Sequence, residues 1–177
     1  MIEDFVQKMI ASTNGVHYLD RINRLESYPR YSLPIKKAKA KEIMLDIGCG
    51  WGRWLAAGAD KDYIPVGLDL RPQFAETSLK VLKAQNIVGY TVVGDLAHMP
   101  FKESTFNFIW SFSVIQHTHR KKMTSCLSHI NRMLADNGYT LLEFPNKHGI
   151  RNRFGTAQKG EKLKDAESGE EYKESCV

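Results

Sequence analysis

The sequence has few of the residues that build metal, redox or disulfide sites. Its three cysteines, Cys49, Cys126 and Cys176, lie far apart in a chain of 177 residues and show neither metal-ligand nor redox spacing. This pattern argues against zinc and iron–sulfur chemistry and favours a reducing compartment, so we expect a cytoplasmic protein. Cys49 is best interpreted as a small residue that fills a turn.

Long apolar segments are also absent. The longest, over residues 106–115, is interrupted by polar residues, and no segment approaches the roughly 20 apolar residues that a membrane-spanning helix needs. Charged residues within the first eight positions argue against a secretory signal there. With 42% hydrophobic residues, the composition is that of a globular protein with one core, since the chain is too short for two typical domains.

Acidic residues are outnumbered, and the formal net charge is +5. The basic excess is local, over residues 36–41 and 120–122. Such runs are usually solvated faces. No aromatic platform of the kind that stacks bases accompanies them, so nucleic acid is not the partner that we expect.

The stretch over residues 43–52, IMLDIGCGWG, is the feature around which the chain is organised. Its apolar half predicts a buried parallel strand, and its alternating glycines predict the tight turn into a helix. Gly48, Gly50 and Gly52 leave the turn without Cβ atoms, so a flat ligand can lie against bare backbone. The dinucleotide fingerprint requires a glycine where Arg53 stands, which makes a nicotinamide cofactor a poor fit.

An acid follows this turn at the distance that a β-α-β unit requires. Asp69 ends the next apolar run, about 20 residues after the glycines, where a carboxylate can accept both hydroxyls of a ribose. The alternative is that Asp69 caps the helix opened by Arg71 and Pro72, and the two roles are compatible.

Hydrophobic periodicity predicts alternating helices and strands along the chain. The predicted helices cover residues 3–12, 16–25, 52–58, 72–84 and 118–134, and the predicted strands cover 43–47, 64–68, 88–93, 106–111 and 139–144.

The pattern Asp46-x-Gly48-x-Gly50-x-Gly52 resembles the glycine motif of the class I S-adenosylmethionine-dependent methyltransferases. Asp69, the pair Gly94-Asp95 and the segment 111–117, which ends in a histidine, extend the resemblance over about residues 42–146. The resemblance implies a Rossmann-like, doubly wound α/β sheet that contains strands one to five of the family fold. It also implies S-adenosylmethionine as the cofactor, bound across the carboxyl ends of the strands.

Each implied contact answers one part of that cofactor. By the resemblance, the glycine turn binds the carboxylate, Asp69 the ribose and Asp95 the adenine amino group, while Asp46 orients the turn and reaches the cofactor's amino group through water. The cofactor-binding residues implied in this way are Asp46, Gly48, Gly50, Gly52, Asp69, Leu70, Asp95, Leu96 and Ser111.

The implied reaction is an in-line displacement, in which the cofactor carries the chemistry and the protein supplies alignment. His117 is a candidate general base, or else a histidine that packs or caps at a helix start, and Glu143 is a weaker candidate. We therefore assign no catalytic residue. Motifs of the amino-directed and cytosine C5 DNA methyltransferases are absent, which leaves a small-molecule acceptor as the expectation, with methyl transfer to oxygen, nitrogen or carbon. The alternative is a cofactor-binding subunit, or a truncated enzyme, that is active only with a partner.

Three regions are predicted. Residues 1–42 form a helical cap, whose candidates for a lid over the cofactor are Tyr18, Arg21, Arg24, Tyr28 and Tyr31; the alternative is a packing helix with solvated arginines. Residues 43–146 form the cofactor-binding core. Residues 147–177 form a charged, flexible tail without a packed element. Because no candidate exists for the family's last two strands, the fifth strand is an unprotected edge unless a homodimer, another partner or the tail covers it.

Overall fold

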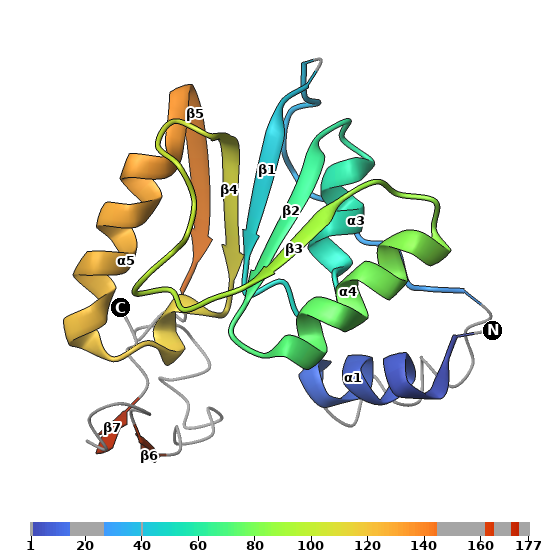
Figure 1. Ribbon diagram of the computed structural model, residues 1–177, viewed down its shortest axis with the longest axis horizontal. Coiled ribbons are helices and arrows are strands. Elements are labelled where there is room, and N and C mark those ends of the chain that lie inside the picture. The colour runs from blue at the N-terminus through green and yellow to red at the C-terminus, as the bar shows by residue number, and fades with distance from the viewer. Residues whose placement is uncertain (1, 15–26, 40, 145–161, 165–170, 174–177) are drawn as a thin grey trace, which may run out of the picture.

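Five parallel strands form the central sheet of the protein. The computed structural model describes residues 2–14, 27–39, 41–144, 162–164 and 171–173. The sheet has the order β3-β2-β1-β4-β5, with every neighbouring pair parallel (Figure 1). Its strands are β1 (Ile43–Ile47), β2 (Ile64–Asp69), β3 (Tyr90–Val93), β4 (Phe106–Phe112) and β5 (Leu134–Glu143). The predicted Rossmann-like, doubly wound fold is confirmed.

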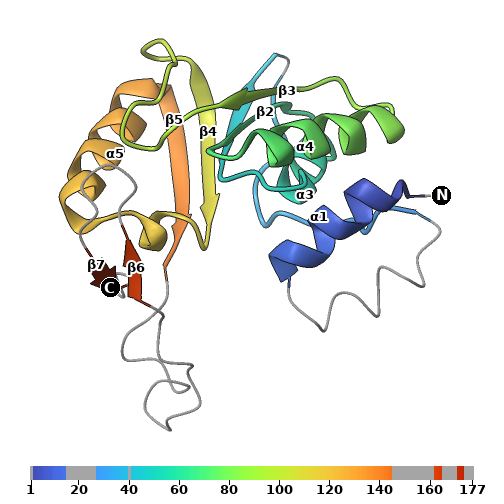
Figure 2. The same cartoon turned by 60° about the horizontal axis from the view of Figure 1, so that its bottom comes forward.

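The helices lie on both faces of this sheet (Figure 2). They are α1 (Asp4–Asn14), α3 (Arg53–Ala59), α4 (Pro72–Ala84), the short 3₁₀ helix η1 (Ile115–His117) and α5 (Arg120–Met133). The predicted second helix, over residues 16–25, lies outside the described residues. No helix among the described parts of the chain has the length and apolar character needed to cross a bilayer.

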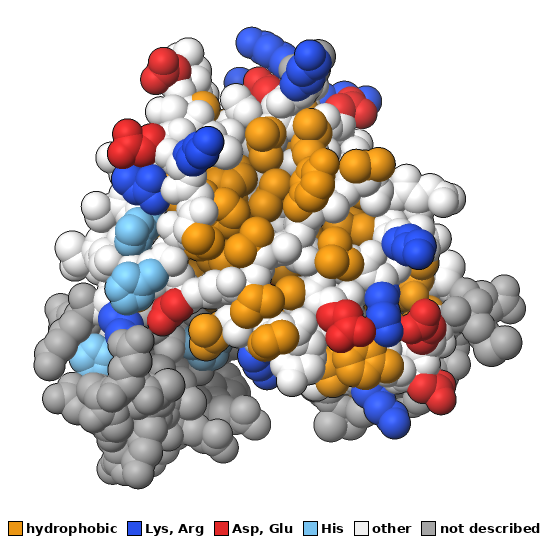
Figure 3. All heavy atoms as spheres, viewed as in Figure 1, with side chains coloured by type: hydrophobic (Ala, Val, Ile, Leu, Met, Phe, Trp, Pro, Cys, Tyr) orange, Lys and Arg blue, Asp and Glu red, His pale blue; other side chains and the backbone are white. Residues whose placement is uncertain are grey.

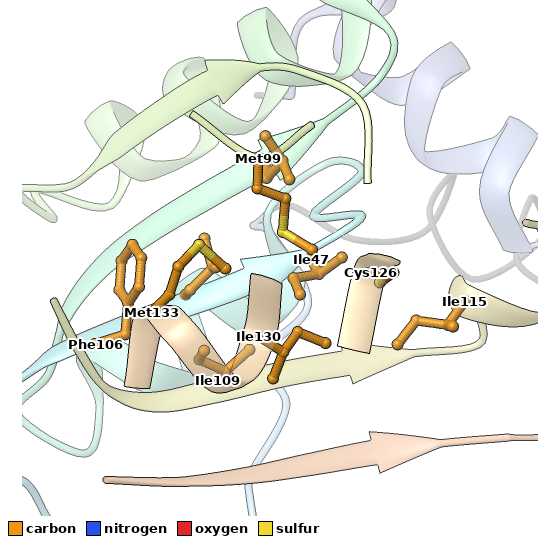
Figure 4. Packing of buried hydrophobic residues seen from close by; sticks show 10 residues of the cluster. Ile47, Met99, Phe106, Ile109, Ile115, Cys126, Ile130 and Met133 are labelled. Atoms are coloured by element: carbon orange, nitrogen blue, oxygen red, sulfur yellow. The ribbon is translucent and has the colours of Figure 1, made fainter. Parts of the chain in front are cut away.

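One face of the sheet packs against α5. Figure 4 shows Cys126, Ile130 and Met133 of this helix among residues of β1, β4 and the loop that precedes β4. On the other face, Met44 and Phe108 pack with Ala57 of α3. β1 is covered from both sides, which explains why the sequence of this strand is almost continuously apolar.

The start of α5 differs from the prediction. The sequence predicts a helix that begins at Thr118, but this residue has extended backbone angles and ends η1 by donating its N–H to the carbonyl of Ile115 at 3.0 Å. The α-helix begins at Arg120 instead. The side-chain periodicity predicts core positions along this helix; Cys126 and Ile130 are buried as predicted, whereas Leu127, also predicted to lie in the core, is 41% exposed.

β5 also begins earlier than predicted, at Leu134, and contains the Asn137-Gly138 pair within an irregularity. The pairing with β4 passes from Phe106–Leu134 to Phe108–Tyr139, so several residues of β5 are left out of the register. Asn137 has a φ of 62°. A Cβ on Gly138 would lie 2.8 Å from the Ala135 carbonyl oxygen, so only glycine fits there.

The tail, predicted to be flexible and without a packed element, contains two short strands. β6 (Lys162–Lys164) and β7 (Glu171–Lys173) pair in an antiparallel two-stranded sheet, in which Leu163 lies opposite Tyr172. The charged composition hid this pair, because backbone hydrogen bonds require no apolar run. The two strands form a separate sheet, so among the described residues β5 remains an edge of the main sheet, as predicted.

The opposite edge of the sheet carries exposed apolar residues. Val88, Tyr90 and Val93 are 78%, 58% and 50% exposed in and just before β3. Figure 3 shows hydrophobic side chains gathered over the middle of the face shown, where β1, β2 and β3 lie in Figure 1. β3 starts at Tyr90, two residues later than predicted.

Candidate functional site

The glycine turn after β1 is held against the end of β2 by backbone hydrogen bonds. The N–H groups of Gly48 and Cys49 both donate to the carbonyl oxygen of Leu68, at 2.7 and 3.1 Å. Gly48, Gly50 and Gly52 have φ values of 73°, 52° and 87°, a region that residues with a Cβ rarely adopt. The predicted turn is therefore present, and its backbone conformation requires these glycines.

Two of these glycines also lack space for a side chain. A Cβ on Gly48 would lie 2.4 Å from a methyl carbon of Val114, and a Cβ on Gly52 would lie 3.0 Å from the Cβ of Ser78. The sequence predicts that the missing Cβ atoms make room for a ligand. The structure adds a cause inside the protein, because the loop after β4 and helix α4 approach the turn too closely for any larger residue.

Asp69 connects the turn to the next helix. One carboxylate oxygen accepts the Gly50 N–H and the other accepts the Arg71 N–H, both at 3.0 Å. Arg71 is itself the N-cap residue of α4, so Asp69 closes a turn before the helix and does not cap the helix by its side chain. Each oxygen keeps further acceptor capacity for a ligand.

Asp95 follows the neighbouring strand end. The Gly94 N–H donates to the backbone carbonyl of Asp69 at 3.0 Å, which joins the ends of β2 and β3. The carboxylate of Asp95 accepts the Ala97 N–H at 2.9 Å. Burial raises the pKa of the Cys126 thiol to about 11, and the negative charge of Asp95 contributes to this rise. Asp95 therefore lies toward α5, whereas Asp69 lies against the glycine turn.

Leu70 and Leu96 flank these two acids. Leu70 is 65% exposed, and Leu96 packs against the hydrophobic cluster under α5. The structure thus leaves the first of them open to a ligand and partly buries the second.

Asp46 and Ser111 are both buried, but they lie on opposite faces of the sheet. Asp46 pairs with Trp110 of β4, whereas Ser111 pairs with Ile47, the residue after Asp46. Because side chains alternate along strands, Ser111 points to the α5 face and Asp46 to the α3 face. The structure does not bring these two predicted residues together.

The carboxyl of Asp46 has no hydrogen-bond partner on either oxygen among the described residues, although it is only 1% exposed. Burial raises its pKa from 3.8 to about 8, with Arg53 lowering it and Asp69 raising it. Ser111 Oγ and Gln116 Oε1 are likewise buried without a partner. The indole N–H groups of Trp51, Trp54 and Trp110 are in the same situation, and buried polar atoms normally have a partner, so these donors and acceptors fit a site for a polar ligand.

An aromatic cluster around Arg53 was missed from the sequence. The Arg53 guanidinium carbon lies 5.7, 5.1 and 5.2 Å from the ring centroids of Tyr31, Trp54 and Phe112. Trp54 also packs edge-on against Trp110, at 5.3 Å between centroids. The sequence named Tyr31 as a lid candidate, and the structure places it against the start of α3; Tyr18, Arg21 and Arg24 lie outside the described residues.

A second missed feature joins the ends of β4 and β5. Ser113 has a φ of 54° and donates its hydroxyl to Glu143 at 2.7 Å. A residue other than glycine in this conformation carries strain, and such strain concentrates at functional sites. His117, the sequence's first candidate for a base, is exposed in η1.

No group of three or more His, Cys, Asp or Glu side chains in the described part of the chain is arranged to hold a metal ion. The residues gathered at the carboxyl edge are the backbone of the turn, carboxylates and aromatic rings, which suit a cationic adenosyl compound.

Comparisons with known proteins agree with this geometry. A family profile described as "Methyltransferase domain" matches residues 44–138. An uncharacterized protein of Methanocaldococcus jannaschii is 29% identical over 147 residues, which cover 79% of this chain and 60% of that protein. A tRNA (carboxymethyluridine(34)-5-O)-methyltransferase of Saccharomyces cerevisiae is 26% identical over 120 residues, covering 67% of this chain and 41% of the yeast protein.

A comparison with solved structures matches a larger share of this chain. The crystal structure of the PH0226 protein from Pyrococcus horikoshii superimposes with a TM-score of 0.65 at 20% identity, covering 90% of this chain and 74% of that one. By contrast, the chain spans less than two thirds of the length of the curated relatives described above.

Proposed function

Because the chain belongs to the methyltransferase-domain family, for which S-adenosylmethionine is the implied cofactor, we propose that it transfers the methyl group of S-adenosylmethionine to an oxygen, nitrogen or carbon of a small-molecule acceptor. The observation that carries this proposal is the union of the glycine turn with Asp69, through the 3.0 Å bond from the Gly50 N–H. This bond sets a carboxylate suited to a ribose diol beside a bare backbone turn.

The other predicted contacts complete the cofactor site in this proposal. Asp95 and the backbone of Leu96 receive the adenine, and the turn together with Asp46 receives the amino-acid end. The buried Asp46 carboxyl, which has no hydrogen-bond partner in the described part of the chain, supports a cationic group at that end. Ser111 remains a predicted contact to the methionine portion from the opposite face of the sheet.

The acceptor lies, in this proposal, beside the aromatic cluster at the ends of β4 and β5. Glu143 pairs in register with Phe112, whose ring contacts both Arg53 and Trp54. Glu143 is therefore a better-supported base than His117. Its carboxylate, oriented by Ser113, accepts the proton of an oxygen or nitrogen nucleophile as the carbon–sulfur bond breaks.

An RNA acceptor is the second candidate. The yeast relative acts on tRNA, and the chain carries a formal net charge of +5. A third arrangement is a cofactor-binding subunit that requires a homodimer or another partner along the β5 edge, which no strand covers among the described residues.

Transfer of labelled methyl groups separates these candidates. The protein is incubated with S-adenosylmethionine labelled in its methyl group, a panel of small aromatic and aliphatic alcohols and amines, and total tRNA and rRNA. We expect label in the small-molecule fraction. Label only in precipitated RNA favours the second candidate, and label that appears only after cell extract is added favours the subunit.

A further inference from the structure

Asp46 is a buried acid whose surroundings do not stabilise a negative charge. Its carboxyl is only 1% exposed, and neither oxygen has a hydrogen-bond partner in the described parts of the protein. The adjacent strand positions are Gly67, which has no side chain, and Trp110. A carboxylate in such a place lacks the donors that stabilise a negative charge.

Three titratable groups face this carboxyl from the neighbouring elements. Arg53 of α3 favours the ionised form, whereas Asp69 at the end of β2 opposes it. The third group is the Cys49 thiol in the turn. Burial raises the pKa of this thiol, and the charges of Asp46 and Asp69 raise it further, so the thiol remains neutral. Burial outweighs Arg53 and leaves the pKa of Asp46 at about 8.

We propose that Asp46 carries a proton in the free protein and releases it to solvent when the cationic end of S-adenosylmethionine settles beside it, so that cofactor loading is coupled to proton release. The inference rests on the proposed function only in that the cofactor binds at this turn. The step is an ionisation: the carboxyl O–H bond breaks, the electron pair stays on the carboxylate, and the proton goes to buffer.

The position of Asp46 gives the coupling its physical cause. The residue lies two positions before Gly48, at the strand end from which the turn leaves. A cation held at the turn supplies the missing favourable interaction with the ionised form. The affinity should consequently rise about tenfold per pH unit while free Asp46 remains protonated and bound Asp46 is ionised.

Calorimetry in two buffers measures the coupling in the wild-type chain. S-adenosylmethionine is titrated at pH 7 in phosphate and in Tris, whose ionisation enthalpies differ, and the difference in observed heat gives the protons exchanged. We expect release of about one proton per cofactor bound. Binding with equal heat in both buffers overturns the inference, whereas no binding in either buffer overturns the proposed function instead.

A second ligand identifies the cation. S-adenosylhomocysteine keeps the ammonium group and lacks the sulfonium. Proton release with both ligands assigns the ammonium as the partner of Asp46, and release with S-adenosylmethionine alone assigns the sulfonium; both results support the coupling.

The variant Asp46→Asn tests the residue itself, with Asp62→Asn as the matched control, because Asp62 is an exposed carboxylate paired with Lys37. We expect proton release to fall to near zero in Asp46→Asn and to persist in Asp62→Asn. In Asp46→Asn, the affinity for S-adenosylmethionine should no longer rise about tenfold per pH unit between pH 5.5 and 7.5. This window lies below the range in which a free α-amino group titrates, about 7.7–8.0, so the ligand's own amino group does not cause the pH dependence. Unchanged proton release in Asp46→Asn contradicts the assignment.

The free protein offers a readout that needs no ligand. Because the folded chain holds the Asp46 proton more tightly than the unfolded chain, stabilisation by this proton is complete below about pH 4 and is lost as the pH rises to about 8. Wild type should lose stability relative to Asp46→Asn between pH 5 and pH 8 in urea unfolding. A constant difference between the two proteins across this range contradicts the proton's presence.

Discussion

The two halves of the carboxyl edge are held by different means. At the ends of β1, β2 and β3, backbone groups bond to backbone or to Asp69, as in the bonds from Gly48 to Leu68 and from Gly94 to Asp69. At the ends of β4 and β5, the contacts are between side chains, through Ser113 and Glu143 and through the rings around Arg53. The ends of β1, β2 and β3 should tolerate few substitutions, because backbone conformation holds them together. The ends of β4 and β5 depend on side chains, so substitutions there should change the methyl acceptor that fits without changing the fold.

Gly48→Ala should produce the largest effect. The substitution places a Cβ at a φ of 73° and 2.4 Å from Val114, so we expect a loss of about 3–5 kcal/mol in the free energy of unfolding from strain and overpacking. Urea unfolding measures this loss. The double variant Gly48→Ala/Val114→Ala removes the two methyl contacts but keeps the strain and a 3.0 Å approach to the Cβ at position 114, so it should recover part of the loss; an additive second loss would show that the contacts with the Val114 methyl groups are unimportant.

Glu143→Gln tests the half that depends on side chains. The amide oxygen can still accept the Ser113 hydroxyl, but the group can no longer take a proton. We expect methyl transfer to the acceptor to slow by about 100-fold, with the affinity for S-adenosylmethionine unchanged. The same test on His117→Gln should give a smaller loss. Equal rates for Glu143→Gln and wild type would remove Glu143 as the base.

Asp69→Asn tests the backbone-held half by a smaller change. The amide keeps one acceptor oxygen but loses the charge. Its NH₂ group then faces either the Gly50 N–H or the Arg71 N–H, which are both donors. We expect the affinity for S-adenosylmethionine to fall by about 10- to 100-fold, the range for a hydrogen bond to a charged group. Titration calorimetry measures it against Asp62→Asn, and equal affinity in the two variants would contradict the ribose role of Asp69.

Ser113→Gly should produce the smallest effect on stability, because two contributions of opposite sign offset each other. Glycine adopts a φ of 54° without strain, but the hydrogen bond to Glu143 is lost. We expect a net stability change within about 1 kcal/mol together with slower methyl transfer. A large loss of stability would show that the Ser113–Glu143 bond serves the fold.

The same contrast explains what the sequence could reveal. The strand, glycine turn and Asp69 are local, and their spacing is fixed by one β-α-β unit, so the sequence predicted them correctly. The Ser113–Glu143 bond depends on β4 lying beside β5 in a register reached only after the irregularity at Gly138, which no local pattern contains. The aromatic cluster similarly requires Tyr31 to reach the start of α3 from a distant loop.

Side-chain type was a poor guide in the tail and at the start of α5. The charged tail predicted no packed element, and two short strands, β6 and β7, pair there through their backbones. At α5, a threonine before a polar stretch looked like a cap, although the chain first makes a 3₁₀ turn whose last hydrogen bond uses Thr118. In both cases backbone hydrogen bonding decided the local structure where side-chain type gave the wrong signal.

The most direct test of the account is calorimetric titration of the purified chain with S-adenosylmethionine, S-adenosylhomocysteine and NAD under identical conditions. We predict micromolar binding of both adenosyl compounds at one site per chain, and no heat of binding with NAD. Binding of NAD without binding of either adenosyl compound would contradict the central claim that the turn and Asp69 form a cradle for an adenosyl sulfonium.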